Sequence, residues 1–281
     1  MKNKAVYFFL LPGIIFLVIF ALLPMIQIFY FSLIDYTLIG SRSYNAFGNY
    51  VKLFGDERFW HVFLNSFLYL AVTPLLIIVS LLLALLLREN KKISIILRSV
   101  YFLPIVTPLV IAGIIWRWIF AEDTGLMNYL LSIINISNIP WLSSFPENMI
   151  SLFIVTIWRG AGYYMMIFLA GLAVLPKEIE EAAEIDGAGY ISKVFYIIIP
   201  QLKYVISLVF VVSAASAIKI FTELYVMIPG APMDNKTIVY YLFSEAFERF
   251  DFGVSSAAGV ILFLITLGFS VANIKLMEHQ K

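Results

Sequence analysis

The chain has 281 residues, of which 62% are hydrophobic and 13% charged, whereas soluble domains have about 45–50% apolar and about 25% charged residues. This composition, with a mean hydropathy of +0.95, leaves too little polar surface for a water-exposed globule and predicts an integral membrane protein. The net charge of +1 argues against nucleic acid as a partner. The absence of cysteine excludes disulfides and thiolate metal sites, and His61 and His279 lie far apart in sequence, so we expect no metal site.

Six segments are long and apolar enough to cross a membrane as helices, which takes about 20 mainly apolar residues. They cover approximately residues 5–31, 61–87, 99–120, 149–174, 202–228 and 254–276. The first span follows Lys2 and Lys4, as a signal peptide would, but it is longer than a signal h-region and no small-residue cleavage site follows it. We therefore expect an all-α membrane protein with one transmembrane domain over residues 1–281 and six transmembrane helices.

The positions of Lys and Arg predict how the spans are oriented. With six spans both termini lie on one side of the membrane, together with the 88–98 and 173–203 loops. That side carries eleven basic residues: Lys2, Lys4, Arg88, Lys91, Lys92, Arg98, Lys177, Lys193, Lys203, Lys275 and Lys281. The other side carries five: Arg42, Lys52, Arg58, Lys236 and Arg249. Because basic residues concentrate in cytoplasmic loops, both termini are predicted to be cytoplasmic.

Two outer loops, residues 122–147 and 229–253, are rich in aromatic residues, among them Trp141, Tyr240 and Tyr241. Aromatic rings at this density suit the headgroup zone of a membrane, where an amphipathic ring is favoured. A docking surface for a partner outside the membrane is the alternative interpretation.

The inner loop of residues 175–200 begins with the pattern of a short helix. Pro176 suits the first helical position, and the glutamates that follow lie where the helix dipole favours carboxylates. Small apolar residues then share one narrow face, which suits close packing against another helix: Ile179, Ala182 and Ala183. Gly187 and Gly189 can supply the positive φ that ends a helix and turns the chain.

A second short helix follows the glycines, because apolar residues recur at i, i+3, i+4 and i+7: Ile191, Val194, Phe195 and Ile198. Pro200 then starts or kinks the next element. A helix that rests on lipid headgroups usually carries Lys and Arg on its polar face, whereas this loop is acidic in its first half. The loop therefore favours a protein partner over the lipid surface.

These residues resemble the EAA loop of binding-protein-dependent ABC importer permeases. The matching positions are Glu181, Ala182, Ala183, Asp186, Gly187, Ala188, Phe195, Ile198 and Pro200. In that family the loop is a coupling helix that sits in a cleft of the ATPase subunit, so the resemblance implies ATPase coupling for residues 175–200.

The resemblance covers almost the whole chain and is to the carbohydrate-uptake branch, of the maltose and glycerol-phosphate permease type. It rests on runs before the second and third spans and near the end of the chain, among them Asn49-Tyr50, Asn65-Ser66, Arg98, Leu103-Pro104, Gly230, Pro232 and Thr237. Pro229 and Ala231 depart from the usual Thr-Gly-Gly-Pro, so substrate details of that stretch are not carried over. The chain also lacks the glycine-rich tail of the companion permease.

The resemblance implies a type I ABC importer permease-like bundle in the plasma (inner) membrane of a prokaryote. It implies as partners a second, different permease subunit, two copies of a sugar-type ABC ATPase, and an extracytoplasmic solute-binding protein. The chain has no Gly-x4-Gly-Lys-Ser/Thr motif and no carboxylate pair in a catalytic setting. We therefore expect a transporter subunit and not an enzyme, with no cofactor of its own and with ATP and Mg²⁺ on the partner ATPase.

Polar residues inside the predicted spans are the candidates for the substrate pathway, because charges there are costly and usually face a cavity or a partner. They are Trp158, Arg159, Tyr163, Tyr164, Ser213, Ser216, Lys219 and Glu223. Rings and hydrogen-bonding groups suit the mixed surface of a sugar. The alternative is that these residues join helices to one another, with a Lys219–Glu223 pair at i, i+4. Gly162 and Ala170 are expected to let helices approach closely.

Two other functions stay open at this point. An ion-coupled secondary carrier would need intramembrane acids, often within internal repeats, and only Glu223 lies near the interior of a predicted span. An ABC permease for an amino acid, peptide or polyamine has the same coupling loop, so the loop alone does not exclude it.

Overall fold

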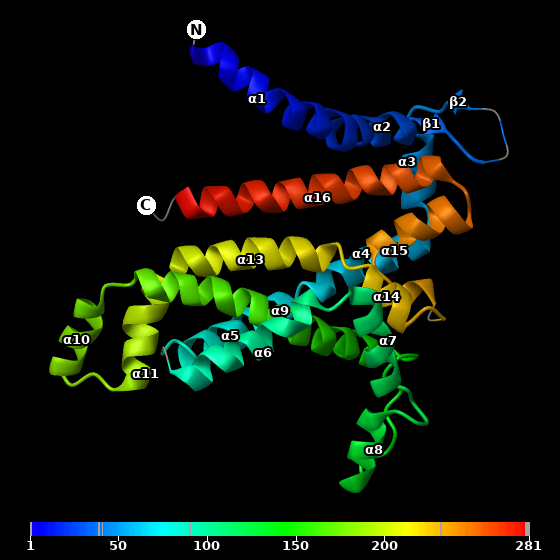
Figure 1. Cartoon of the computed structure of the whole chain (residues 1–281). Coiled ribbons are helices and arrows are strands. Elements are labelled where there is room, and N and C mark those ends of the chain that lie inside the picture. The colour runs from blue at the N-terminus through cyan, green and yellow to red at the C-terminus, as the bar shows by residue number, and fades with distance from the viewer. Residues whose placement is uncertain (1, 39, 41, 90, 231, 279–281) are drawn as a thin grey trace.

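Regular structure in this protein is almost entirely helical (Figure 1). A computed structural model describes residues 2–278 except 39, 41, 90 and 231, so His279 and Lys281 lie outside the described residues. In the described part, β1 (Ile34–Asp35) and β2 (Ser43–Tyr44) form an antiparallel pair at the end of the first long helix.

The helical elements follow one another closely along the chain. In order they are α1 (Lys2–Leu17), η1 (Val18–Leu22), α2 (Leu23–Ser32), α3 (Gly48–Phe54), α4 (Glu57–Tyr69), α5 (Val72–Leu86), α6 (Lys92–Val106), α7 (Leu109–Ile119), α8 (Leu126–Ile133), α9 (Glu147–Val174), α10 (Lys177–Ile185), α11 (Tyr190–Lys193), η2 (Val194–Ile198), α12 (Ile199–Gln201), α13 (Lys203–Ile218), α14 (Thr222–Met227), η3 (Met233–Asn235), α15 (Ile238–Phe243), η4 (Ser244–Glu248) and α16 (Phe252–Glu278).

Four helical stretches of the described chain are long and apolar enough to cross a membrane without a sharp bend. They are Phe8–Ser32, Glu57–Leu86, Glu147–Val174 and Phe252–Ala272, and they correspond to the first, second, fourth and sixth predicted spans. The other two predicted spans are each built from a pair of helices that meet at a sharp angle. Counting each bent pair as one span gives up to six spans.

The third predicted span, residues 99–120, is not one straight helix. Its two parts, α6 and α7, meet at 98°. The break lies at Thr107 and Pro108, which are both extended, with ψ of 130° and 128°. A residue before proline is pushed out of the helical region by the proline ring, which accounts for the position of the break.

The fifth predicted span, residues 202–228, is shorter than expected and is bent at its beginning. The helix Tyr190–Gln201 meets α13 at 70°, close to Pro200, which cannot continue a helix without losing a backbone hydrogen bond. The helix ends at Ile218, and α14 begins only at Thr222. The Thr237 hydroxyl donates to the Ile220 carbonyl at 2.9 Å, so a distant side chain satisfies a backbone group that the helix leaves free.

The elements divide between the two ends of the bundle (Figure 1). The beginning of α1, the end of α16 and the α10–α11 hairpin lie at one end, and α7, α8, α14 and α15 lie at the other. The side of the membrane on which each end lies stays a prediction. In the figure α5, α6, α9 and α13 lie between the two ends, and α16 runs beside α2.

A glycine brings two central helices into backbone contact. A Cβ atom added to Gly162 of α9 would lie 1.8 Å from the carbonyl oxygen of Tyr101 in α6. No side chain fits there, so the prediction that Gly162 allows a close approach of helices is confirmed.

The aromatic residues of the outer loops divide between the interior and the surface: Phe247 and Phe250 are exposed, whereas three others are internal. Trp141, Tyr240 and Tyr241 are buried. The Trp141 indole N–H donates to Asn128 Oδ1 at 2.8 Å, and the Asn128 amide donates to the Glu122 and Ile139 carbonyls at 2.8 and 3.0 Å. Because the buried donors and acceptors of this loop form hydrogen bonds with one another, the loop has a small folded core of its own.

Candidate functional site

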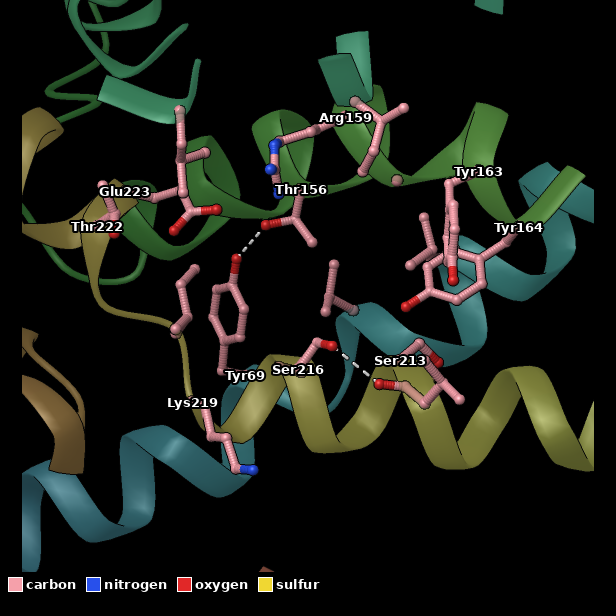
Figure 2. Close-up of a pocket in the computed structure, with 18 of the residues that line it drawn as sticks. Tyr69, Thr156, Arg159, Tyr163, Tyr164, Ser213, Ser216, Lys219, Thr222 and Glu223 are labelled. Carbon is pink, nitrogen blue, oxygen red and sulfur yellow. Dashed lines mark hydrogen bonds between the residues drawn. The ribbon is translucent and has the colours of Figure 1, made fainter. Parts of the chain in front are cut away.

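A cavity of about 370 Å³ lies between α4, α5, α6, α7, α9, α13 and α14 (Figure 2). It contains polar groups from four of these helices among apolar side chains. Seven of the eight predicted pathway residues line it: Arg159, Tyr163, Tyr164, Ser213, Ser216, Lys219 and Glu223. Residues far apart in sequence are thus brought to one place in the membrane-spanning part of the chain.

Helical periodicity explains how α9 and α13 present these groups. Thr156, Arg159 and Tyr163 follow one another at spacings of three and four in α9, so they lie on one face. Ser213 and Ser216 are three apart in α13 and share the face that was predicted for them.

The charged groups of the cavity come from different helices. In Figure 2 the guanidinium of Arg159 and the carboxylate of Glu223 point toward one another across the cavity. Glu223 is buried, at 9% exposure. The Nε of Arg159 is buried and has no hydrogen-bond partner among the described residues. A buried donor without a partner is costly, so this N–H is suited to a polar ligand.

The two serines use their hydroxyl protons within their own helix. The Ser213 hydroxyl donates to the Val209 carbonyl at 2.6 Å, and the Ser216 hydroxyl donates to the Val212 carbonyl at 2.9 Å. Their oxygens keep acceptor capacity toward the cavity, because a hydroxyl can accept while it donates.

Two of the predicted pathway residues are placed differently from the rest. Trp158 does not line the cavity and packs against Trp116, with ring centroids 5.4 Å apart. The amino group of Lys219 points away from the other polar groups in Figure 2. The helix ends between Lys219 and Glu223, so the alternative i, i+4 pair of these two residues lacks the continuous helix that it requires.

Three polar residues of the cavity were missed by reasoning from the sequence: Tyr69, Thr156 and Thr222. Tyr69 is fully buried, and its hydroxyl lies 3.3 Å from the Leu152 carbonyl and also bonds the Thr156 hydroxyl. Single tyrosine and threonine residues in an apolar run carry little signal, and only the crossing of α4 and α9 brings these two together.

The second candidate site is the hairpin at the opposite end of α9, where the predicted helix–elbow–helix is confirmed. Helix α10 ends at Ile185 with Asp186 as its C-cap, and Gly187 follows with φ of +79°. The Ala188 N–H donates to the Ala183 carbonyl at 2.9 Å, and the Gly187 N–H donates to the Glu184 carbonyl at 3.0 Å. These two bonds define a Schellman motif, which glycine favours because it adopts positive φ without strain.

The hairpin presents both acidic and apolar side chains to its surroundings. Glu181, Ala182 and Asp186 are exposed, whereas Ala183 is buried. Ile185 is 88% exposed and Phe195 is 63% exposed. Exposed large apolar side chains grouped on one feature mark an interaction surface.

The second helix of the hairpin does not use its apolar residues as one face. Val194 and Ile198 are buried, whereas Ile191 and Phe195 are exposed. A π-helical turn over Val194–Ile198 changes the rotation between successive side chains, so the i, i+3, i+4 pattern divides between bundle and exterior. Pro200 is exposed and follows this turn.

The family of the chain follows from a comparison with known families. Residues 76–276 match the family described as "Binding-protein-dependent transport system inner membrane component", and this match covers well over half of the chain. The chain belongs to this family. The resemblance inferred from the coupling loop is therefore confirmed, and the hairpin lies inside the matched region.

Individual relatives of this permease match it over nearly its full length. It is 33% identical over 285 residues to the arabinooligosaccharides transport system permease protein AraP of Bacillus subtilis, which covers 100% of this chain and 90% of AraP. It is 29% identical over 283 residues to the trehalose/maltose transport system permease protein MalF of Thermococcus litoralis, which covers 100% of this chain and 96% of MalF.

Among solved structures, the permease is similar to a chain of a bacterial ABC transporter involved in the import of the acidic polysaccharide alginate. The TM-score is 0.84 at 21% sequence identity, with 98% of this chain and 96% of that chain covered. At this identity the similarity establishes a shared fold, that of an ABC importer permease.

Proposed function

We propose that this permease is the membrane-spanning subunit of an ATP-driven, binding-protein-dependent importer for a sugar or a related polyol or oligosaccharide. The observation that carries the proposal is the α10–α11 hairpin, an exposed feature with a coupling-loop sequence that lies at the opposite end of the bundle from α14 and α15. The named functions of AraP and MalF support a carbohydrate as the transported solute.

The hairpin docks on a separate ATPase subunit, which binds ATP and Mg²⁺. Glu181 and Asp186 supply exposed acceptors, and Ile185 and Phe195 supply apolar contact area. When ATP closes a pair of ATPase subunits, the docked hairpin moves with them. Helices α9 and α13 adjoin the hairpin in the chain, and both line the cavity, so they carry this movement to it.

The cavity forms one half of the translocation pathway, and a second, different permease subunit supplies the other half. Arg159, Glu223 and the serine oxygens offer donors and acceptors, and Tyr163 and Tyr164 offer ring faces. This combination suits a solute with hydroxyl groups on an apolar ring. An extracytoplasmic solute-binding protein delivers the solute at the end of the bundle that carries α8 and α15.

The test is solute uptake and ATP hydrolysis by the assembled transporter in vesicles, for variants of the hairpin. We expect Gly187→Val to lower uptake more than tenfold, because a β-branched residue is strongly disfavoured at φ of +79° and the elbow must change shape. Gly187→Asn is the matched control, since asparagine tolerates positive φ and no atom lies within 4 Å of the added Cβ. It should keep most of the uptake.

Substitutions in the cavity should change a different quantity. Ser216→Ala and Arg159→Ala are expected to weaken the apparent affinity for solute while the transporter still assembles with its ATPase. Uptake that persists after ATP depletion, with the ion gradient held constant, would contradict the ATP-driven mechanism and favour an ion-coupled carrier.

A further inference from the structure

Helix α10 stands apart from the helix bundle (Figure 1) and is held by ion pairs. Among the described residues, α10 takes part in two. Glu184 pairs with Lys193 of α11, which stays within the hairpin. Glu180 pairs with Arg88, which follows the end of α5. The second pair joins the hairpin to a helix from which it is separated by about ninety residues of sequence.

The Arg88–Glu180 pair has the geometry of a strong, partly shielded contact. The Arg88 Nη2 nitrogen lies 2.7 Å from both carboxylate oxygens of Glu180. The side chains are 30% and 17% exposed. Hydrogen bonds between two charged groups are shorter and about twice as strong as those between neutral groups.

The segment that carries Arg88 is fixed on its other side by Arg98 of α6. The Arg98 Nε donates to the Leu87 carbonyl at 2.9 Å, and its Nη2 donates to the Glu89 carbonyl at 3.2 Å. These bonds satisfy carbonyls that the end of α5 leaves free. Arg88 therefore projects from a rigid support, and a pull on its side chain acts on α5.

Helix α5 connects this support to the cavity. It runs from Val72 to Leu86 without a break, and its Val72 and Leu76 line the cavity. The covalent routes from the hairpin enter α9 through Pro176 and α13 through the 70° bend near Pro200. The ion pair adds a third route, to a helix that the hairpin does not adjoin in the chain.

The three neighbouring glutamates of α10 have different surroundings. Glu180 faces the bundle and Arg88, whereas Glu178 and Glu181 are exposed. Successive residues of a helix are rotated by about 100°, so one acidic helix can contact the bundle and a partner subunit at the same time.

We propose that the Arg88–Glu180 ion pair is a strut that transmits the movement of the coupling hairpin to α5 and so to the cavity. Both are positioning residues: they contact neither the solute nor ATP. The inference rests on the proposed function, since it assigns a mechanical role within the same coupling step.

The test measures solute molecules transported per ATP hydrolysed by the assembled transporter in vesicles. We expect Arg88→Glu alone and Glu180→Arg alone each to lower this ratio about fivefold, the factor that corresponds to about 1 kcal/mol. The double variant Arg88→Glu/Glu180→Arg should restore the ratio to within about twofold of the original, because the pair is rebuilt with its charges exchanged. A pair needed only for folding would change the amount of assembled transporter and leave the number of solute molecules transported per ATP unchanged.

Glu89→Gln is the matched control, since it breaks an exposed ion pair next to Arg88, with Lys91 two residues away, that joins no second element. Its ratio should stay unchanged. If the reversals insert poorly, Arg88→Gln and Glu180→Gln provide milder variants, which should each lower the ratio and together cost no more than either alone.

Two results would overturn the proposal that the Arg88–Glu180 pair transmits movement. One is an unchanged ratio in the single variants, and the other is a loss that the exchanged pair does not rescue. In either case Gly187→Val separates the two proposals: if it still uncouples transport, the hairpin keeps its coupling function and only the strut is wrong.

Discussion

At the scale of single residues, Lys236 shows how burial can reverse what a sequence suggests. It counts in the sequence as one of the outer basic residues, yet it is 1% exposed. Its amino group donates to the Ile228 carbonyl and lies 4.4 Å from the centre of the Tyr240 ring. Burial lowers the pKa of Lys236 to about 8 from the ordinary value of 10.5.

This pKa predicts a specific dependence of stability on pH. Between about pH 8 and 10.5 the unfolded chain holds a proton on this amine that the folded chain has lost, so folding becomes more favourable as the pH rises. From pH 7 to pH 10 the free energy of unfolding should rise by about 2 kcal/mol relative to Lys236→Met, which has no titrating amine. Thermal unfolding of both proteins in detergent at each pH measures this difference. If the stability of the two proteins changed with pH in the same way, the pKa of the Lys236 amine would not be lowered by folding.

The residues that lie in the hairpin elbow and the cavity, where the sequence placed them, share a simple physical signature. Gly187 lies where a helix must end, and Arg159, Ser213 and Ser216 are polar groups in apolar helices, where few roles are open to them. Trp158 does not line the cavity, and its ring packs against that of Trp116.

At the scale of elements, a network of ion pairs and hydrogen bonds connects the beginning of α4 to the region before α16. Asp56 caps α4, accepting from the Arg58 N–H at 3.0 Å, and Arg58 Nη2 lies 3.2 Å from Glu245 Oε1. The Tyr241 hydroxyl donates to Asp56 at 2.9 Å. Burial raises the pKa of Glu245, whose side chain is only 5% exposed, so Arg58 offsets part of the cost of this buried carboxylate.

Removing the arginine should therefore cost more than removing a surface charge. We expect Arg58→Met to lower the free energy of unfolding by about 2 kcal/mol, because it leaves a buried carboxylate with a single, more exposed partner, Arg249. The double variant Arg58→Met/Glu245→Gln should recover about half of the loss. Arg249→Met is the control, with an effect below about 0.5 kcal/mol. Denaturation in detergent compares the original protein with the three variants. Equal losses of unfolding free energy for Arg58→Met and Arg249→Met would contradict a stabilising role of the Arg58–Glu245 ion pair.

The bounds of a helix could be predicted where the local sequence pattern determines them. They could not be predicted where contacts between distant residues determine them. The long helices Glu147–Val174 and Phe252–Glu278 follow directly from their apolar runs. The break at Thr107 had a local signal in Pro108, but the apolar run continues through it. The gap between α13 and α14 had none, because Thr237, seventeen residues further along the chain, holds the Ile220 carbonyl.

At the scale of the whole molecule, the division of the chain into two ends makes a prediction about the membrane. The loop before α6 and the α10–α11 hairpin lie at one end, and the loop that leads into α8 lies at the other. The excess of Lys and Arg predicts that the first end is cytoplasmic. Because the chain has no cysteine, single cysteines can report this orientation without background.

We expect Asp123→Cys to react with a membrane-impermeant maleimide in intact cells, and Lys92→Cys to react only after the cells are permeabilised. Both positions are exposed in the structure, so lack of reaction in intact cells reports the side of the membrane. The reverse labelling pattern would invert the topology and place the coupling hairpin outside the cell.

The contact at Gly162 limits how such a molecule can change shape. The backbones of α6 and α9 touch at this point, and a Cβ would meet the Tyr101 oxygen. The two rods can tilt about the touching point but cannot part there without opening a void. Tilting in the plane of the two helices then separates them at one end and brings them closer at the other end. We therefore expect the close contact at Gly162 to act as a pivot between α6 and α9.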